Sequence, residues 1–254
     1  MTPVHERICV SGISTWNQTL DADLQLYDEL GIHTIGVALR KLDGADDVAL
    51  VRSSGLRVAN VIGVGHAGLA TAIETAQQLD APRVVFTTGP AGALEWEEAA
   101  DAFAQAIEHV LPAPLTLCLE HTNSLRTDVS FVHTLGDAID LAERLDISVC
   151  MEINACWAER DLAHTIADGI DRIGLVQVSD TAIGTLSTPN RLVPGDGDIP
   201  LDRIVGCLLE AGYDGVFELE LIGPRIEEEG YRSAIRRSCT YLGALLTELQ
   251  NSLL

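Results

Sequence analysis

The sequence predicts an α/β protein whose strands and helices alternate and close into a (β/α)8 barrel. Short apolar runs recur along the chain, separated by segments with the periodicity of amphipathic helices. Strands that are apolar on both faces are typical of a parallel sheet covered on its outside by helices. The length of 254 residues matches one such barrel. We therefore expect one domain spanning residues 1–254.

The first half of the chain contains four strand and helix units. Gly31 follows the first expected helix, and a glycine just past a helix is a common stop signal. The expected elements are the strand Ile8–Ile13, the helix Leu20–Leu30, the strand His33–Leu39, the helix Ala45–Ser54, the strand Leu56–Ile62, the helix Leu69–Leu79, the strand Arg83–Thr88 and a helix near Glu95–Val110.

The second half repeats the alternation and adds a glycine-rich loop at Val193–Ile199. Gly195 and Gly197 permit backbone conformations closed to other residues, and Pro194 fixes the entry to the loop. The expected elements are the strand Leu115–Glu120, a helix near Phe131–Leu145, the strand Ile147–Glu152, a helix near Ala158–Ala167, the strand Ile173–Ser179, the helix Leu201–Ala211, the strand Phe217–Leu221 and the helix Tyr231–Leu249.

A doubly wound open sheet is the alternative arrangement of these elements. It would gain support from a G-x-G-x-x-G turn that binds a dinucleotide after an early strand. Residues 63–68 fit only the bare spacing of that motif. The barrel is therefore favoured over a nucleotide-binding sheet.

Charge and composition narrow the possible partners. The chain has 38 acidic and 16 basic residues and a formal charge of −22, which repels nucleic acids and anionic membranes. No apolar run reaches the ~20 residues of a membrane helix, and the N-terminal residues do not resemble a leader, so we expect a cytoplasmic protein. The six cysteines form no C-x-x-C pair and are expected to be reduced thiols of the core.

Three carboxylates mark the expected site. The active sites of (β/α)8 barrels lie at the carboxyl ends of the strands. Glu120 and Glu152 each end a strand that is otherwise uncharged, and Glu220 occupies the same place on the eighth strand. Converging carboxylates repel one another without a cation, and clusters of oxygen ligands suit Mg²⁺ or Mn²⁺. The sequence therefore predicts one divalent metal ion at this rim.

Five segments carry distinctive motifs: Leu117–Glu120, the Met151–Glu152 strand end, Val176–Asp180, Arg191–Ile199 and Gly212–Glu220. Together they resemble the xylose isomerase-like TIM barrels of the sugar phosphate isomerase/epimerase superfamily. Members are (β/α)8 barrels with one divalent metal, and include ketose epimerases, hydroxypyruvate isomerases, inosose dehydratases and dehydroshikimate dehydratases; endonuclease IV is a relative. The resemblance implies Glu120, Glu152, Gln177 and Glu220 as ligands.

Two residues depart from the family pattern. Ala155 stands where a His commonly follows the ligand of the sixth strand, and Gln177 stands where the seventh-strand ligand is commonly His, although Asp180 of that H-x-x-D motif is kept. A neutral amide oxygen suits Mg²⁺ or Mn²⁺ better than Zn²⁺. The acidic charge and the lack of several histidines for a zinc cluster disfavour endonuclease activity.

The resemblance implies that a bound metal assists proton abstraction beside a substrate carbonyl, giving an enediolate. Glu120 and Glu220 are then candidate acid and base groups as well as ligands. Lys41, the only lysine of the chain, and His66, after the third strand, are further catalytic candidates, although a surface lysine and an ordinary loop histidine are equally open readings.

Four more rim residues are candidates for contacts with the substrate. Arg191 could bind a hydroxyl, carboxylate or phosphate, and Trp16 could form an apolar wall for a sugar ring. Asp180 lies at the same rim. Glu218 lies two residues before Glu220 and so faces the same side of its strand, either supporting the site or as a core carboxylate with its own partners.

The function we expect is isomerisation, epimerisation or dehydration of a small sugar or polyhydroxy ketone. A hydrolase or deglycosidase-like activity on the same scaffold and a non-catalytic sugar-binding barrel remain alternatives. The binding barrel gains support from Ala155 and Gln177, where the family commonly has His. A homo-oligomer is possible, because barrels of this kind often pair through outer helices or rim loops.

Overall fold

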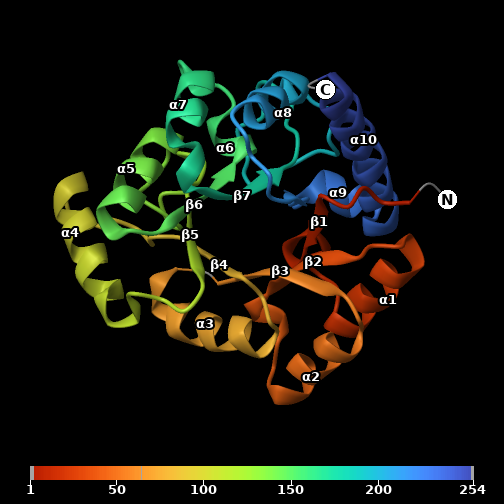
Figure 1. The fold of residues 1–254 in the computed structure, drawn as a ribbon, viewed down its shortest axis with the longest axis horizontal. Coiled ribbons are helices and arrows are strands. Elements are labelled where there is room, and N and C mark those ends of the chain that lie inside the picture. Colours follow the sequence, from red (N-terminus) through yellow and green to blue (C-terminus); the bar gives the residue numbers. More distant parts are fainter. Residues whose placement is uncertain (1–2, 64, 253–254) are drawn as a thin grey trace.

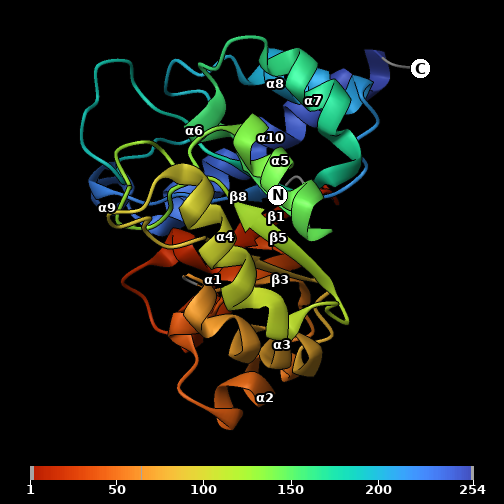
Figure 2. The same cartoon turned by 90° about the vertical axis from the view of Figure 1, so that its left-hand side faces the viewer.

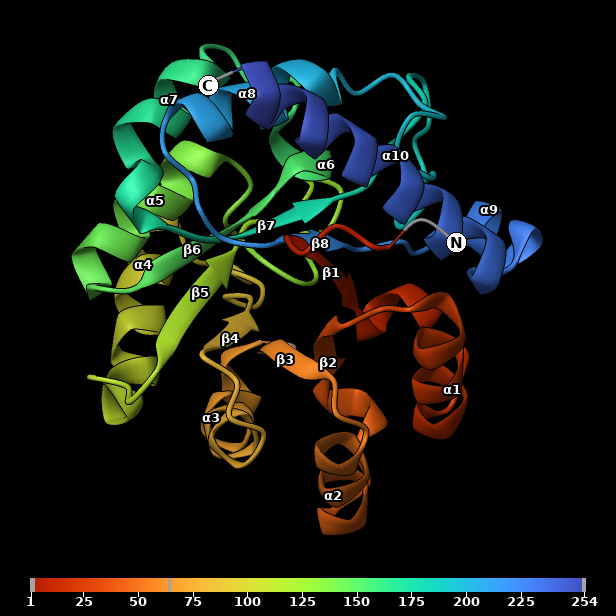
Figure 3. The ribbon, with the colours of Figure 1, turned by 45° about the vertical axis from the view of Figure 1, so that its right-hand side comes forward.

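The computed structural model describes residues 3–63 and 65–252, in which eight parallel strands form a closed barrel. Neighbouring strands pair in chain order and β1 pairs with β8, so the sheet has no edge (Figure 3). This confirms the (β/α)8 prediction and shows that the open sheet was wrong. The strands are β1 Ile8–Ser11, β2 Thr34–Ala38, β3 Arg57–Ile62, β4 Arg83–Phe86, β5 Thr116–Glu120, β6 Ser148–Glu152, β7 Ile173–Val178 and β8 Phe217–Leu219.

Helices surround the strands on the outside of the barrel (Figure 1). Two short ones, α6 after β6 and α9 after β8, were not predicted, because a helix of one or two turns is too short to show the 3.6-residue pattern. The helices are α1 Leu20–Leu30, α2 Ala45–Ser53, α3 Leu69–Gln78, α4 Trp96–Ile107, α5 Leu135–Leu145, α6 Ile153–Cys156, α7 Leu162–Gly169, α8 Leu201–Glu210, α9 Pro224–Glu229 and α10 Tyr231–Ser252.

Capping residues set several helix boundaries. The Thr134 hydroxyl accepts the backbone N–H of Asp137 at 3.0 Å, so α5 begins at Leu135 rather than at Phe131 as the sequence suggested. Gly31 ends α1 in the left-handed conformation, with φ of 67°, as expected for a glycine at this position.

Apolar residues fill two regions. The larger core lies between the sheet and the helices, and a smaller cluster of seven buried residues includes Ala38, Val85, Cys150 and Leu175 from four strands. All six cysteines are free thiols, as predicted. Within the described residues, no helix combines the length and the apolar character needed to cross a membrane.

A polar layer lies inside the barrel around the fully buried Glu218. Its carboxylate accepts Nδ2 of Asn60 at 2.8 Å and Nε2 of Gln177 at 3.1 Å. Gly36 of β2 faces this layer. A Cβ at position 36 would lie 2.0 Å from Oε1 of Glu218 and 2.9 Å from Oδ1 of Asn60. The glycine therefore makes room for the buried carboxylate.

Replacing Gly36 by Ala should destabilise the protein by about 1–3 kcal/mol, because the methyl group overpacks the layer and breaks its hydrogen bonds. Urea unfolding measures this change. The control is Gly136→Ala in α5, where an added Cβ meets nothing within 4 Å and a small gain is expected from helix propensity. Equal midpoints for the two variants would contradict the tight packing inferred around Glu218.

Candidate active site

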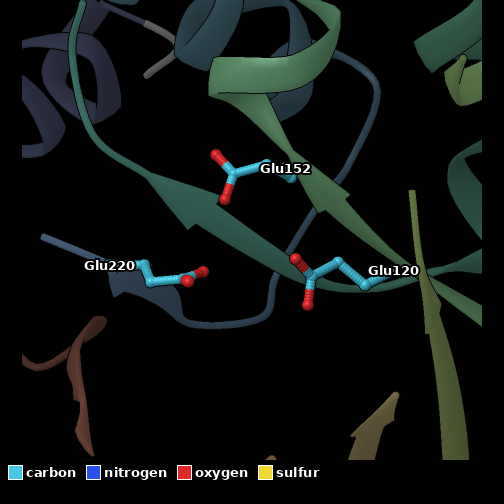
Figure 4. A group of neighbouring side chains, drawn as sticks. All are labelled: Glu120, Glu152 and Glu220. Carbon is cyan, nitrogen blue, oxygen red and sulfur yellow. The ribbon is translucent and has the colours of Figure 1, made fainter. Parts of the chain in front are cut away.

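Three glutamates converge at the carboxyl ends of the strands, as the sequence predicted. Glu120 ends β5, Glu152 ends β6, and Glu220 follows β8. Each offers one carboxylate oxygen, and these oxygens lie within 4.8 Å of one another. Figure 4 shows the three side chains pointing toward a common point. Glu152 is buried, Glu220 is 8% exposed and Glu120 is partly exposed.

A cation of the protein itself faces these glutamates. Nη1 of Arg191 lies 2.7 Å from Oε2 of Glu152 and 3.2 Å from Oε2 of Glu220. The same nitrogen donates to the backbone carbonyl of Glu220 at 3.0 Å. Arg191 belongs to the long segment between β7 and α8, which extends beyond the barrel on the same side as α9 (Figure 2). Arg191 therefore lies beside the glutamates, and its predicted contact with the substrate stays a prediction.

Desolvation and mutual repulsion raise the pKa values of two of these carboxyl groups. Desolvation raises the pKa of Glu120 well above its usual value, and the charges of Glu220 and Glu152 add to the shift. Burial raises the pKa of Glu152 to about 7, although Arg191 opposes that shift. The neighbouring glutamates raise the pKa of Arg191 despite its burial, so the guanidinium stays charged. Glu152 is therefore able to exchange a proton near neutral pH.

Gln177 of β7 pairs in register with Glu152 on one side and with Glu218 on the other. Its Nε2 donates to Glu218, which leaves Oε1 buried without a hydrogen-bond partner among the described residues. Burial raises the pKa of Glu218 to about 7, and the hydrogen bonds from Asn60 and Gln177 oppose the shift. Glu218 thus fixes the Gln177 amide with its oxygen unpaired.

These donors fit a divalent cation. Oε2 of Glu152 and Oε2 of Glu220 are buried and accept no well-aligned hydrogen bond, and Oε1 of Gln177 has no partner. Buried oxygens without a partner are costly. Arg191 faces the two carboxylate oxygens, whereas Oε1 of Gln177 faces no donor among the described residues. Glu120, Glu152 and Glu220 form a group of carboxylates that could hold a metal ion.

Asp180 organises the glycine-rich loop. Its Oδ1 accepts the backbone N–H of Ile199 at 3.1 Å, and its Oδ2 accepts those of Gly195 and Gly197 at 2.9 and 3.0 Å. A Cβ on Gly197 would lie 2.3 Å from Oδ1 of Asp180, so glycine is needed there. Both oxygens are engaged by the protein, and the prediction of a substrate contact for Asp180 remains untested.

Lys41 lies in a separate buried ion pair. Its Nζ is 2.5 Å from Oδ2 of Asp23, and it also donates to the carbonyl and hydroxyl oxygens of Thr15 at 2.7 and 2.8 Å. These contacts use the three donors of the ammonium group. The structure does not bring Lys41 into the glutamate cluster.

His66 and Trp16 also have partners outside the cluster. Nδ1 of His66 lies 2.8 Å from the carbonyl oxygen of Thr88, which indicates that this nitrogen carries the proton. Trp16 is 36% exposed, and the Arg40 guanidinium lies 3.9 Å from the centroid of its ring. Their predicted roles therefore stay predictions.

Two hydrogen bonds of Glu152 that are donated by backbone N–H groups were not predicted. Asn154 donates its backbone N–H to Oε1 of Glu152 at 2.9 Å. The Glu152 N–H in turn donates to Nε2 of the buried His121 at 3.2 Å, and burial lowers the pKa of this imidazole to about 3. The first contact depends on α6, which the sequence pattern did not reveal, and the second on the orientation of His121, for which the sequence pattern gives no signal.

Comparison with known protein families identifies the family of this barrel. A family model described as "Xylose isomerase-like TIM barrel" matches residues 63–241, more than half of the chain. The chain belongs to this family. The resemblance noted from the strand-end motifs is thereby confirmed.

Three proteins show distant similarity to this chain. An inosose isomerase of Halalkalibacterium halodurans is 28% identical over 112 residues, which are 41% of this chain and 40% of that protein. A solved structure from Sinorhizobium meliloti has a TM-score of 0.84 at 22% identity and covers 92% of this chain and 96% of its own. The IolI protein, solved with a zinc atom, has a TM-score of 0.79 at 19% identity, covering 96% and 99%. At these identities the two structures show the shared fold.

Proposed function

We propose that this chain is a divalent-metal-dependent isomerase or epimerase, or a dehydratase, acting on a small sugar or keto-polyol. The convergence of Glu120, Glu152 and Glu220 at the barrel mouth carries the proposal. Family membership and the partial match to an inosose isomerase support it.

The metal would be held by the three glutamates together with Oε1 of Gln177. A divalent ion bound there would polarise a substrate carbonyl and increase the acidity of the neighbouring C–H group. The amide oxygen favours Mn²⁺ or Mg²⁺ in this chain, whereas the IolI neighbour was solved with zinc.

The protein groups supply the proton transfers. Glu120 is partly exposed at the mouth, and desolvation and the neighbouring carboxylates raise its pKa, so it holds a proton more readily than an ordinary glutamate. Glu220 faces Glu120 and would act in the second proton transfer of the reaction. Return of the proton to carbon gives an isomer or epimer, and loss of a β-hydroxyl gives dehydration. Arg191 would bind a substrate hydroxyl or carboxylate.

Metal analysis, and thermal melting with and without Mn²⁺, test the proposed metal binding. The wild type should hold one divalent ion per chain and melt at a higher temperature with Mn²⁺. Glu220→Gln and Gln177→Ala should each lose most of that stabilisation. Glu74→Gln and Gln78→Ala, on the exposed side of α3, are the matched controls. A wild type without bound metal or Mn²⁺-induced stabilisation would contradict the proposal.

Deuterium uptake tests the chemistry. When the Mn²⁺-loaded protein is incubated with inososes and ketohexoses in D₂O, deuterium should enter the carbon next to the carbonyl of the reacting substrate. Cleavage of a substrate without deuterium in its carbon skeleton would instead indicate a hydrolase. A metal-free protein that binds sugars without converting them would indicate a binding barrel.

A further inference from the structure

One nitrogen atom of Arg191 lies among three oxygens of the site. Its Nη1 is 2.7 Å from Oε2 of Glu152, 3.2 Å from Oε2 of Glu220 and 3.0 Å from the Glu220 carbonyl oxygen. The Arg191 side chain is only 14% exposed. The guanidinium is therefore a buried counterion of the glutamate cluster.

The contacts of Glu152 restrict where another cation can bind. Its Oε1 already accepts the backbone N–H of Asn154 at 2.9 Å. The oxygen left for a cation is Oε2, which Arg191 contacts. Glu220 contributes to the competition through its buried Oε2, which lies 3.2 Å from the same nitrogen.

We propose that Arg191 and the divalent ion compete for Glu152 and Glu220, so that metal binding displaces the guanidinium; this inference rests on the proposed metal site. Ligand distances of about 2.0–2.1 Å, as for Mg²⁺, would place the ion in direct contact with oxygens that Nη1 now approaches. The guanidinium cannot relieve the conflict by losing its proton, because arginine stays charged in proteins.

The backbone confines the displaced side chain to the mouth of the barrel. Arg191 donates its N–H to the Ile222 carbonyl at 3.0 Å, and Leu192 exchanges two hydrogen bonds with Asp180 at 2.8 and 3.1 Å. Asp180 is itself held by the amides of the glycine-rich loop. Because the backbone is fixed on both sides, only the side chain moves. The released guanidinium stays at the mouth, available to an anionic or hydroxyl-rich substrate.

Mn²⁺ titration by calorimetry, with melting of the metal-free proteins, tests this competition. Arg191→Gln should bind Mn²⁺ roughly 5- to 150-fold more tightly than the wild type, the usual range of coupling between two sites. The metal-free variant should melt at a lower temperature, because its glutamates lack a counterion. Arg191→Lys, which keeps a positive charge, should bind Mn²⁺ with an affinity between the two and also shows whether a folded variant can be obtained at this position.

Arg144→Gln is the matched control. Arg144 also contacts two carboxylates, those of Glu97 and Asp101, but on the exposed surface of α5. The Arg144→Gln protein should bind Mn²⁺ like the wild type. That result would exclude a general effect of losing one positive charge. Mn²⁺ binding by Arg191→Gln that is equal to or weaker than binding by the wild type would overturn the competition and leave the metal site standing. A lack of binding by every protein would instead refute the metal site and the proposed function with it.

Discussion

Replacing Glu120 by Gln is expected to lower kcat by roughly 10²- to 10⁴-fold, the range typical of a lost general acid or base. The amide is a weaker ligand than the carboxylate, so the variant is assayed at saturating Mn²⁺, and it cannot take up the substrate proton. KM should change much less than kcat, since the interaction lost belongs to the proton transfer. Steady-state kinetics with the substrate found by deuterium uptake measures both constants.

Glu120 is the best candidate of the three because its carboxylate is the least engaged. Glu152 has one oxygen on the Asn154 N–H and the other beside Arg191. Glu120 is partly exposed and, among the described residues, receives no hydrogen bond from a neighbour. Glu74→Gln on α3 should leave kcat unchanged. A Glu120→Gln variant within tenfold of the wild-type kcat would remove Glu120 from the proton transfer.

The glutamate cluster could be predicted because it depends only on strand ends. In a parallel barrel every strand ends at the same rim, so a charge closing an apolar run must lie there. Glu120 and Glu152 satisfy this condition, and Glu220 follows the last strand by one residue. Gln177 also lies on the same rim because it pairs with Glu152 in the sheet register.

The Arg191 contacts with these glutamates could not be derived from the sequence. Arg191 lies in a long connection without helical or strand periodicity, and its position depends on the Asp180 interactions with the glycine-rich loop. Side-chain placement in such a loop follows from tertiary contacts rather than from local pattern.

The ion pair of Lys41 could not be derived from the sequence either. Its uniqueness and its place after the second strand suggested catalysis, but its ammonium group pairs with Asp23 of α1. In the sequence, Asp23 is an acidic residue in the first turn of a helix, which is a common position for a carboxylate. That it is buried and faces Lys41 follows from how α1 packs, which the spacing of the two residues does not show.

Glu218 should make the stability of the metal-free protein depend on pH. Burial raises its pKa from 4.5 to about 7, so between these values the folded protein holds a proton that the unfolded chain has lost. The contribution of protonated Glu218 to the free energy of unfolding is fully present below about pH 4.5 and disappears as the pH rises through 7. A shift of this size corresponds to about 3 kcal/mol. The protein should therefore become less stable toward neutral pH because of this group.

Glu218→Gln isolates the effect. The amide cannot ionise, so the free energy of unfolding of the variant, relative to the wild type, should increase by about 3 kcal/mol between pH 4.5 and 8. Loss of an acceptor for Asn60 or Gln177 lowers the stability of the variant by a similar amount at every pH, and so does not alter this slope. Urea unfolding in EDTA at several pH values measures the difference, in which the titration of distant groups cancels. A difference that is constant with pH would mean that the buried carboxyl ionises at its ordinary pKa, and that the hydrogen bonds from Asn60 and Gln177 fully offset its desolvation.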